Sequence, residues 1–229
     1  MSVQATKPRA VARQVLADHV YEEIFASLMD GRLKAGAGIS IDGMARDLNV
    51  SPTPVREALA RLEATGMVRR EALKGYKVAP LFTTDELAEL LDARLVIEPV
   101  NALRACERTT PELNNALEQS ILDLRNAPRG ASFVEFRDSW RADERFHRLI
   151  AESAANQFIL SAYHALGGQI QRFRFFGGLG VTDAEHAIKE HTAVLNAFKA
   201  GDPEGARDAM IAHLSGVKRR AIKDVAAHG

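Results

Sequence analysis

Several features are scarce or absent in this chain of 229 residues. It has one cysteine, Cys106, so an intramolecular disulfide is excluded, which is typical of proteins from a reducing compartment. No apolar run approaches the roughly 20 residues of a membrane span, and residues 1–10 lack the apolar core of a signal peptide. These absences predict a cytoplasmic protein with no membrane partner. We expect residues 1–12 to form a disordered arm.

Net charge is absent too, because 30 Lys and Arg balance 30 Asp and Glu. The charges are nevertheless unevenly spread. Residues 1–80 hold 12 basic and 9 acidic side chains, a difference of +3, whereas residues 81–229 hold 18 and 21, a difference of −3. A mildly basic first region beside an acidic second region favours nucleic-acid binding at one end of the chain only.

Capping and turn residues predict two short helices joined by a tight turn. In the first, residues 41–48, apolar side chains recur at helical spacing, and Asn49 ends the helix because asparagine tolerates the left-handed conformation. Ser51 then caps a second helix that runs to about Ala64, and Pro52 takes its first position, where the missing N–H costs nothing. The pair describes a helix-turn-helix, whose second helix enters a DNA groove.

The second of these helices presents different side chains on its two sides. Val55, Leu59 and Leu62 recur at helical spacing and face the core. The polar and basic side chains that remain outside are the candidate DNA-binding residues of the helix pair: Arg46, Ser51, Thr53, Arg56 and Arg61. The alternative is an ordinary solvated surface, since helix-turn-helix geometry also occurs in proteins that bind no DNA.

A basic hairpin follows the predicted recognition helix. Residues 67–68 and 76–78 read as short strands around a turn. The cations on this hairpin are Arg69, Arg70, Lys74 and Lys77. Such a wing places cations against the phosphates that flank a groove, so Lys77 joins the candidate DNA-binding residues. An amphipathic helix that Gly31 brings to an end precedes the pair, with an apolar residue at every fourth position: Leu16, Val20, Ile24 and Leu28.

Helical periodicity dominates the chain after a short linker at Pro80. Helices are predicted near residues 84–107, 111–126, 132–153, 155–176, 183–200 and 203–227. No strand signal interrupts them. The predicted fold class is therefore mainly α, with an N-terminal winged helix-turn-helix domain over residues 13–80 and a C-terminal all-α six-helix bundle over residues 81–229.

One carboxylate and three imidazoles can converge inside this bundle. Asp143 and His147 are four residues apart, so both project from one helical face. His191 and His213 lie among apolar residues on two later helices. This ligand set suits a divalent metal ion such as zinc, nickel or manganese. The alternative is that the three histidines are satisfied core residues with no metal.

A charged pair lies on the inner face of the first bundle helix. Arg94 and Glu98 share one stripe with Leu87 and Leu91, so both are expected to face the bundle. Burial of such groups without partners is costly. Two arrangements remain open: Arg94 and Glu98 pair only with each other, or Arg94 also binds the carboxylate of an effector through its guanidinium fork.

The first region resembles the GntR family of bacterial transcription regulators. The motif that carries the resemblance is Val50-Ser51-Pro52-Thr53-Pro54-Val55-Arg56-Glu57-Ala58-Leu59, followed by Arg61-Leu62-Glu63 and Gly66-Met67-Val68. The resemblance covers residues 13–80 and implies that a two-fold dimer binds a pseudo-palindromic site. A basic residue often stands in the place of Pro52, so this chain lacks one phosphate or base contact. Asp42 is not assigned a contact.

The second region resembles the FCD ligand-binding domain of the FadR-type GntR regulators. The matching landmarks are Arg94-Leu95-Val96-Ile97-Glu98, Asp143-Glu144-Arg145-Phe146-His147, Glu190-His191 and His213-Leu214. In metal-containing members an aspartate and three histidines hold the ion. The resemblance therefore implies the metal ligands Asp143, His147, His191 and His213.

Together these features predict a homodimeric transcription regulator whose affinity for double-stranded operator DNA is set by a small organic acid. The metal ion and Arg94 would form the anion site. Two alternatives are a metal-sensing regulator with no organic effector and a metal-dependent enzyme that activates water at the ion. An enzyme would leave the helix-turn-helix unexplained, and no convincing general base lies outside the ligand set, so we expect no catalytic residues.

Overall fold

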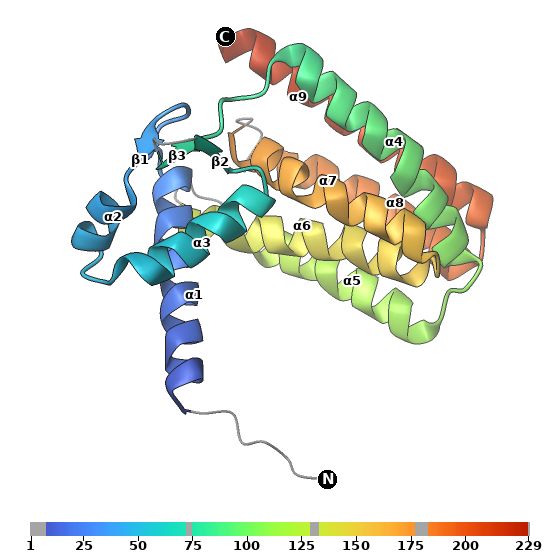
Figure 1. The fold of residues 1–229 in the computed structure, drawn as a ribbon. Coiled ribbons are helices and arrows are strands. Elements are labelled where there is room, and N and C mark those ends of the chain that lie inside the picture. Colours follow the sequence, from blue (N-terminus) through green and yellow to red (C-terminus); the bar gives the residue numbers. More distant parts are fainter. Residues whose placement is uncertain (1–7, 72–74, 129–132, 177–182, 229) are drawn as a thin grey trace. The chain divides into compact units, whose positions relative to one another are not determined.

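The computed structural model describes residues 8–71, 75–128, 133–176 and 183–228 (Figure 1). The chain divides into two compact units, and the first ends at Leu81 and the second begins at Phe82. This boundary lies one residue from the expected one. The described residues are mostly helical, and the mainly α fold class is confirmed. None of the described helices combines the length and the apolar character needed to cross a membrane.

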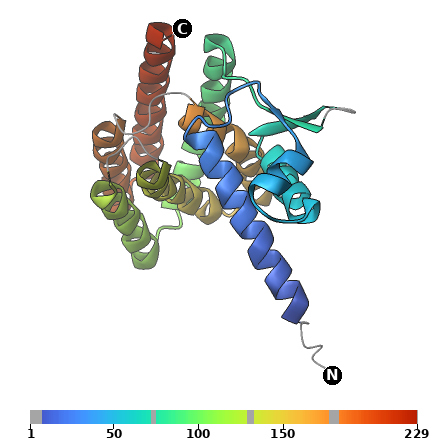
Figure 2. The ribbon, with the colours of Figure 1, turned by 90° about the vertical axis from the view of Figure 1, so that its left-hand side faces the viewer.

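The described residues of the first unit form three helices and three short strands. Their order is α1 (Pro8–Met29), β1 (Gly38–Ile39), α2 (Ile41–Asp47), α3 (Pro52–Ala64), β2 (Val68–Glu71) and β3 (Gly75–Val78). α1 packs along α3 (Figure 2). Residues 8–12, which we expected in a disordered arm, belong to α1. Pro8 is compatible with this earlier start because the first helical position needs no N–H.

The turn between α2 and α3 follows the predicted chemistry with one exception. Asn49 has φ 52°, the left-handed conformation that ends α2. Ser51 stands at the N-cap position of α3, but its side chain accepts no capping hydrogen bond. Pro54, at the third helical position, has no N–H to donate to that hydroxyl. Ser51 is therefore a cap by position only, and its side chain stays exposed.

The wing is a three-stranded antiparallel sheet in the order β1-β3-β2. Val68 pairs with Val78, and Arg69 pairs with Lys77, so valines lie on one face and cations on the other. β1 was not predicted, because a strand of two residues is too short to show an alternating pattern. Its Ile39 is buried and pairs with Tyr76, which joins the sheet to the core of this unit.

The part of the second unit that the structure describes forms the six predicted helices. They are α4 (Thr84–Cys106), α5 (Pro111–Asn126), α6 (Phe133–Ser153), α7 (Gln157–Phe176), α8 (Ala184–Ala200) and α9 (Pro203–His228). Most boundaries lie within a residue or two of the expected ones. α7 begins two residues late because Ala155 has φ 51°, and Asn156 caps the helix by accepting from the backbone N–H of Phe158 and Ile159 at 3.1 Å.

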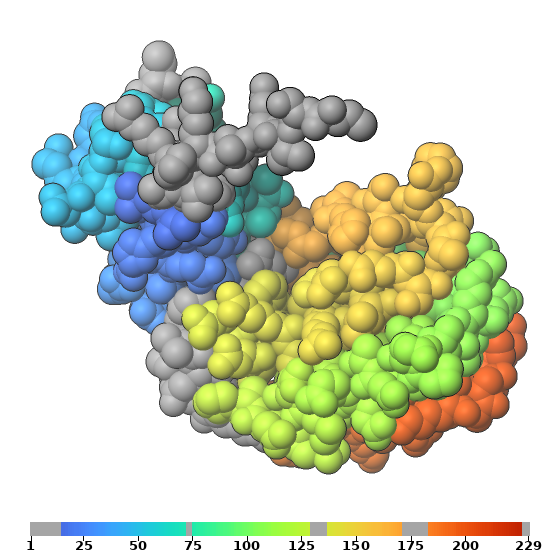
Figure 3. Space-filling view, turned by 90° about the horizontal axis from the view of Figure 1, so that it is seen from below, coloured from blue at the N-terminus to red at the C-terminus, as the bar shows by residue number. Residues whose placement is uncertain are grey.

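The helices of the bundle pack against one another in pairs. α4 lies along α9, α8 also packs on α9, and α5 lies along α6. Figure 3 shows α5, α6 and α7 side by side on one face of this unit. The main core contains Phe146, Phe198 and Leu214, all fully buried. This packing brings the inner faces of α4, α6, α8 and α9 together, and these faces carry the predicted site.

Candidate functional site

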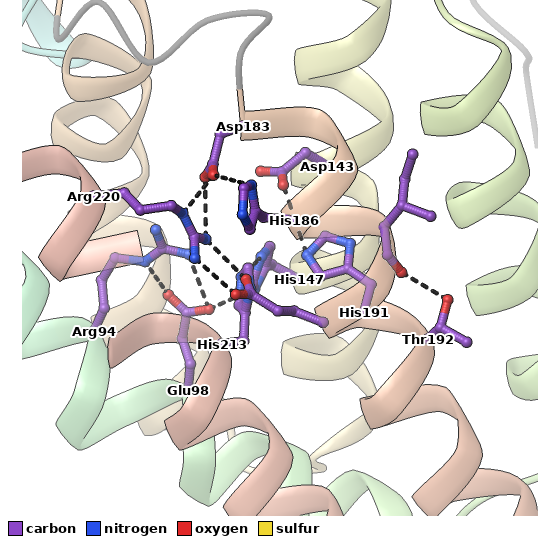
Figure 4. Close-up of polar contacts among 12 residues, drawn as sticks. Arg94, Glu98, Asp143, His147, Asp183, His186, His191, Thr192, His213 and Arg220 are labelled. Carbon is purple, nitrogen blue, oxygen red and sulfur yellow. Dashed lines mark hydrogen bonds and ion pairs between the residues drawn. The ribbon is translucent and has the colours of Figure 1, made fainter. Parts of the chain in front are cut away.

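The three histidines of the predicted site meet inside the bundle. His147 comes from α6, His191 from α8 and His213 from α9, and their side chains are at most 4% exposed. One ring nitrogen of each lies within 4.8 Å of those of the other two. Asp143, one turn before His147, has an oxygen 3.7 Å from His191 Nε2 (Figure 4). The structure therefore brings all four predicted metal ligands together.

Each of two histidines contacts a carboxylate with the ring nitrogen that points away from the centre. His147 Nδ1 lies 2.6 Å from Glu98 Oε2, and His213 Nδ1 lies 2.8 Å from Glu190 Oε2. Burial alone would raise the pKa of Glu98, but Arg94 and His147 hold it well below its usual range. Burial opposes ionisation of Glu190 as well, yet its bonds to His213 and Arg220 lower its pKa to about 2.

The two remaining nitrogens of this histidine pair face each other. His213 Nδ1 hydrogen-bonds to Glu190 Oε2, and His147 Nδ1 lies beside Glu98 Oε2. The two Nε2 atoms are 3.3 Å apart. Burial lowers the pKa of His213 to about 4, even though its bond to Glu190 acts in the opposite direction. The inner nitrogens of His147 and His213 are thus directed at one point, where both could bind a cation.

The donor set fits a divalent metal ion. Two imidazole nitrogens bound to one zinc at about 2.0–2.1 Å are roughly 3.3 Å apart when the angle at the metal is tetrahedral. The observed separation of the two Nε2 atoms is 3.3 Å. Carboxylate partners on the outer ring nitrogens are the usual supports of metal-binding histidines. Phe146 stacks on His191 with the ring centroids 4.1 Å apart, so this third ring is held in place as well.

Arg94 lies beside this centre on α4 and is 1% exposed. Its Nε and Nη2 atoms donate to Glu98 at 2.5 and 3.3 Å, so the expected pair is present. The pair is not isolated, because Glu98 also holds His147. Arg94 Nη1 is buried and has no hydrogen-bond partner among the described residues. One donor of the guanidinium is therefore left over at the edge of the centre.

Sequence reasoning missed the partners of His213. In the sequence Glu190 stands out only as part of the Glu190-His191 motif, and no motif indicates Arg220 or Asp183. Arg220 contacts Glu190 at 2.8 Å and Asp183 at 2.5 Å. One signal was available: Arg220 follows His213 by seven residues, so the two share a face of α9. Nothing in the spacing connects either of them to Asp183.

The predicted DNA-binding residues of α2 and α3 mostly lie on the surface. Arg46, Ser51, Thr53 and Arg56 are exposed, and the two arginines pair with no described residue. A surface hollow of about 530 Å³ spans the turn between the two helices. The residues that line it are Asp42, Ala45, Arg46, Asn49, Val50, Ser51 and Pro52.

Two predicted contact residues have partners inside the first unit. Arg61 forms an ion pair with Asp18 of α1 at 2.6 Å and lies over the ring of Tyr21, 4.3 Å from its centroid. It therefore joins α3 to α1. Lys77 lies 3.7 Å from Glu71 on the neighbouring strand, and both side chains are partly exposed. Lys74 lies outside the described residues.

Comparisons with known proteins agree with both units. The family described as bacterial regulatory proteins, gntR family, matches residues 16–78, and the FCD domain matches residues 89–216. A protein of Escherichia coli K12 assigned as the regulator of the L-lactate dehydrogenase operon is 30% identical, covering 93% of this chain and 90% of its own. A protein of Paenarthrobacter nicotinovorans assigned as a repressor of D-xylose utilization is 28% identical over 93% and 91% of the two chains.

Solved structures show the same fold. A GntR regulator from Rhodococcus sp. RHA1 superposes with a TM-score of 0.70 at 18% identity, covering 90% of this chain and 97% of its own. E. coli McbR/YncC gives a TM-score of 0.66 at 22% identity, with 91% and 97% covered. The chain therefore belongs to the GntR family of bacterial regulatory proteins, carries an FCD domain as its second unit, and is a DNA-binding transcriptional regulator.

Proposed function

We propose that this regulator holds a divalent metal ion through Asp143, His147, His191 and His213, and that a small carboxylate bound beside the ion controls operator affinity. The observation that carries the proposal is the pair of Nε2 atoms 3.3 Å apart, with a carboxylate beside the outer Nδ1 atom of each ring. Zinc, nickel and manganese are the ions we favour. The bound ion would supply positive charge and open coordination positions.

The charges around the centre favour an anionic effector. Asp143 would cancel one of the two charges of the ion, so the ion with its ligands would keep one positive charge. Arg94 and Glu98 cancel each other, and the more distant group of Glu190, Arg220 and Asp183 carries one negative charge in total. Arg94 Nη1 is buried without a partner among the described residues, and a carboxylate oxygen is a suitable acceptor for it. The named operons of the two relatives handle an organic acid and a sugar, both small polar molecules. Arg94 and the residual charge favour the acid for this chain.

The same proposal assigns DNA contacts in the first unit. Arg56 lies one turn into α3 and would reach a base edge, while Ser51 and Thr53 lie nearer the phosphates. Arg46 and Lys77 would contact phosphates on either side of α3. Arg61 is not included, since it is engaged with Asp18 and Tyr21.

We further propose that the regulator acts in the cytoplasm as a homodimeric repressor. A single recognition helix reads only about half a site, so two copies are needed for a pseudo-palindrome. Three large apolar side chains of the bundle are well exposed and would suit a contact between copies: Val96, Val100 and Phe158. A strict monomer in light scattering, with and without DNA, contradicts this part.

Calorimetry on the chelator-treated protein tests the proposal. Zn²⁺, Ni²⁺ and Mn²⁺ are titrated first, and then acetate and lactate, with acetamide and lactamide as uncharged controls. We expect one ion per chain, raising stability by roughly 2.7 kcal/mol at a hundred times its Kd. The acids should bind only to the metal-loaded protein, and the amides should not bind. His147→Ala should lose both responses.

Gel shifts with a DNA site selected from a random pool complete the test. A change in DNA affinity on adding acid to the metal-loaded protein supports the proposal. If the ion alone changes DNA affinity and no acid adds to it, the protein is a metal sensor. A stoichiometric ion in the His147→Ala, His191→Ala double variant contradicts the assigned site.

A further inference from the structure

A chain of polar side chains runs from His213 to the start of α8 (Figure 4). We call it the His213 bracket, and it consists of His213, Glu190, Arg220 and Asp183. Arg220 donates to both oxygens of Glu190, at 2.8 and 2.9 Å, and Glu190 Oε2 also lies 2.8 Å from His213 Nδ1. On its other side Arg220 meets both oxygens of Asp183, at 2.5 and 3.2 Å. Asp183 is the N-cap residue of α8 and is 3% exposed.

Arg220 fixes the position of Glu190. The Glu190 side chain is 22% exposed, so on its own it has room to turn toward solvent. Two parallel hydrogen bonds from one guanidinium hold a carboxylate in a single orientation. In that orientation Glu190 accepts the Nδ1 proton of His213, which leaves Nε2 unprotonated and directed at His147 Nε2. Arg220 thus acts on the ring of His213 without touching it.

Gly216 provides the space that this arrangement needs. It lies on α9 between His213 and Arg220, at positions i, i+3 and i+7 of one face. A Cβ atom at Gly216 would lie 2.7 Å from Arg220 Nη1 and 2.7 Å from Glu190 Oε1. Both distances are far below ordinary contact, and the atoms that would have to move are those of the ion pair itself. Glycine is unfavourable inside a helix compared with alanine, but at this position the ion pair occupies the space that a side chain would need.

We propose that Glu190, Arg220 and Asp183 are positioning residues that set the metal affinity of His213, and that Gly216 is required to keep them in place. This inference rests on the proposed metal site and adds the residues that tune it. Partners of metal-binding histidines change metal affinity by roughly 10–100-fold when they are removed. The bracket also connects His213, the proposed ion ligand on α9, to Asp183 at the start of α8. A change in the position of His213 would therefore act on both helices.

Zn²⁺ titration of the metal-free full-length protein tests the bracket with matched substitutions. Glu190→Ala, Arg220→Gln and Gly216→Ala should each weaken Zn²⁺ binding on the order of 10–100-fold. Glu118→Ala is the control for the glutamate, because Glu118 pairs with Lys199 on the surface. Gly167→Ala is the control for the glycine, because Gly167 lies within α7 and an added Cβ there meets nothing within 4 Å. Both controls should bind Zn²⁺ like the unmodified protein.

Nitrogen NMR separates positioning from general loss of structure. The His213 ring should carry its proton on Nδ1 in the metal-free protein, and Glu190→Ala should move it to Nε2 while the melting temperature stays within a few degrees. Unchanged Zn²⁺ affinity in Glu190→Ala and Gly216→Ala overturns the inference, as does an equal loss in the two controls. If Arg220→Gln does not fold, these two variants decide alone. If the unmodified protein takes up no Zn²⁺, Ni²⁺ or Mn²⁺, the proposed metal site fails together with the bracket.

Discussion

Charged side chains lie in opposite surroundings in the two units. In the first unit Arg46 and Arg56 are exposed, and the ion pair of Arg61 with Asp18 is about half exposed on both sides. In the bundle Arg94 and Glu98 are almost completely buried. Water screens the first group, whereas the interactions of the second act in a medium of much lower polarity.

This difference separates exposed charges that suit DNA recognition from buried charges that suit the proposed metal site. A surface that meets DNA needs cations free to exchange water for phosphate, and such pairs contribute little to stability. A buried centre needs every charge to have a partner, because an unpaired buried charge is strongly destabilising. Substitutions should therefore change DNA binding in the first unit and folding or metal binding in the second.

The largest effect is expected for Arg94→Ala. The change leaves Glu98 buried without its guanidinium partner, and breaking a buried pair costs about 3–5 kcal/mol. The single tryptophan, Trp140, lies in α6, so urea unfolding followed by its fluorescence reports on the bundle. A loss below about 1 kcal/mol would mean that the buried pair behaves like a surface pair and would remove the contrast between the units.

Acidification should destabilise the metal-free bundle by about 3 kcal/mol between pH 7 and pH 4. The pKa of His213 is about 4 in the folded protein, against 6.5 for an ordinary histidine. The unfolded chain therefore binds more protons across this interval, so stability falls as pH falls. Trp140 fluorescence in urea at pH 7, 6 and 5 measures the slope. His213→Asn should show a flatter slope, and an equal slope in that variant would assign the effect to other groups.

Arg56→Ala is expected to weaken binding to the selected DNA site by roughly 1–3 kcal/mol and to relax sequence preference. Because Arg56 is exposed and pairs with no described residue, unfolding of the bundle and Zn²⁺ affinity should not change. Lys77→Ala should instead weaken binding to all sequences and flatten its salt dependence. Gel shifts at two salt concentrations distinguish the two. Full affinity in the Arg56 variant would contradict its assignment.

The smallest effect is expected for Arg61→Ala, below about 1 kcal/mol of stability. Arg61 loses an exposed ion pair with Asp18 and its position over Tyr21. Its effect should decrease in high salt, which screens exposed pairs. If the variant instead loses DNA affinity without losing stability, Arg61 contacts DNA as the sequence first suggested, and the pair with Asp18 opens on binding.

Local signals account for most of what the sequence predicted. The helices of the bundle follow from the spacing of apolar residues, and the turn at Asn49 follows from a single residue. Both can therefore be predicted from short stretches of sequence. Asp143 and His147 are also a local pair. The bracket of Glu190, Arg220 and Asp183 depends on which helices become neighbours, and no periodicity encodes that. Arg61 shows the same limit, since its partner Asp18 lies on another helix.

Two prolines at the start of α3 have a consequence for the kinetics of DNA binding. Pro52 and Pro54 fix the backbone angle φ near −65° before and after folding, so this turn has few conformations to lose. Ordering of mobile segments is one of the costs of association. The recognition helix therefore meets DNA with its first turn already formed, and affinity differences between operator sequences should appear mainly in dissociation rates.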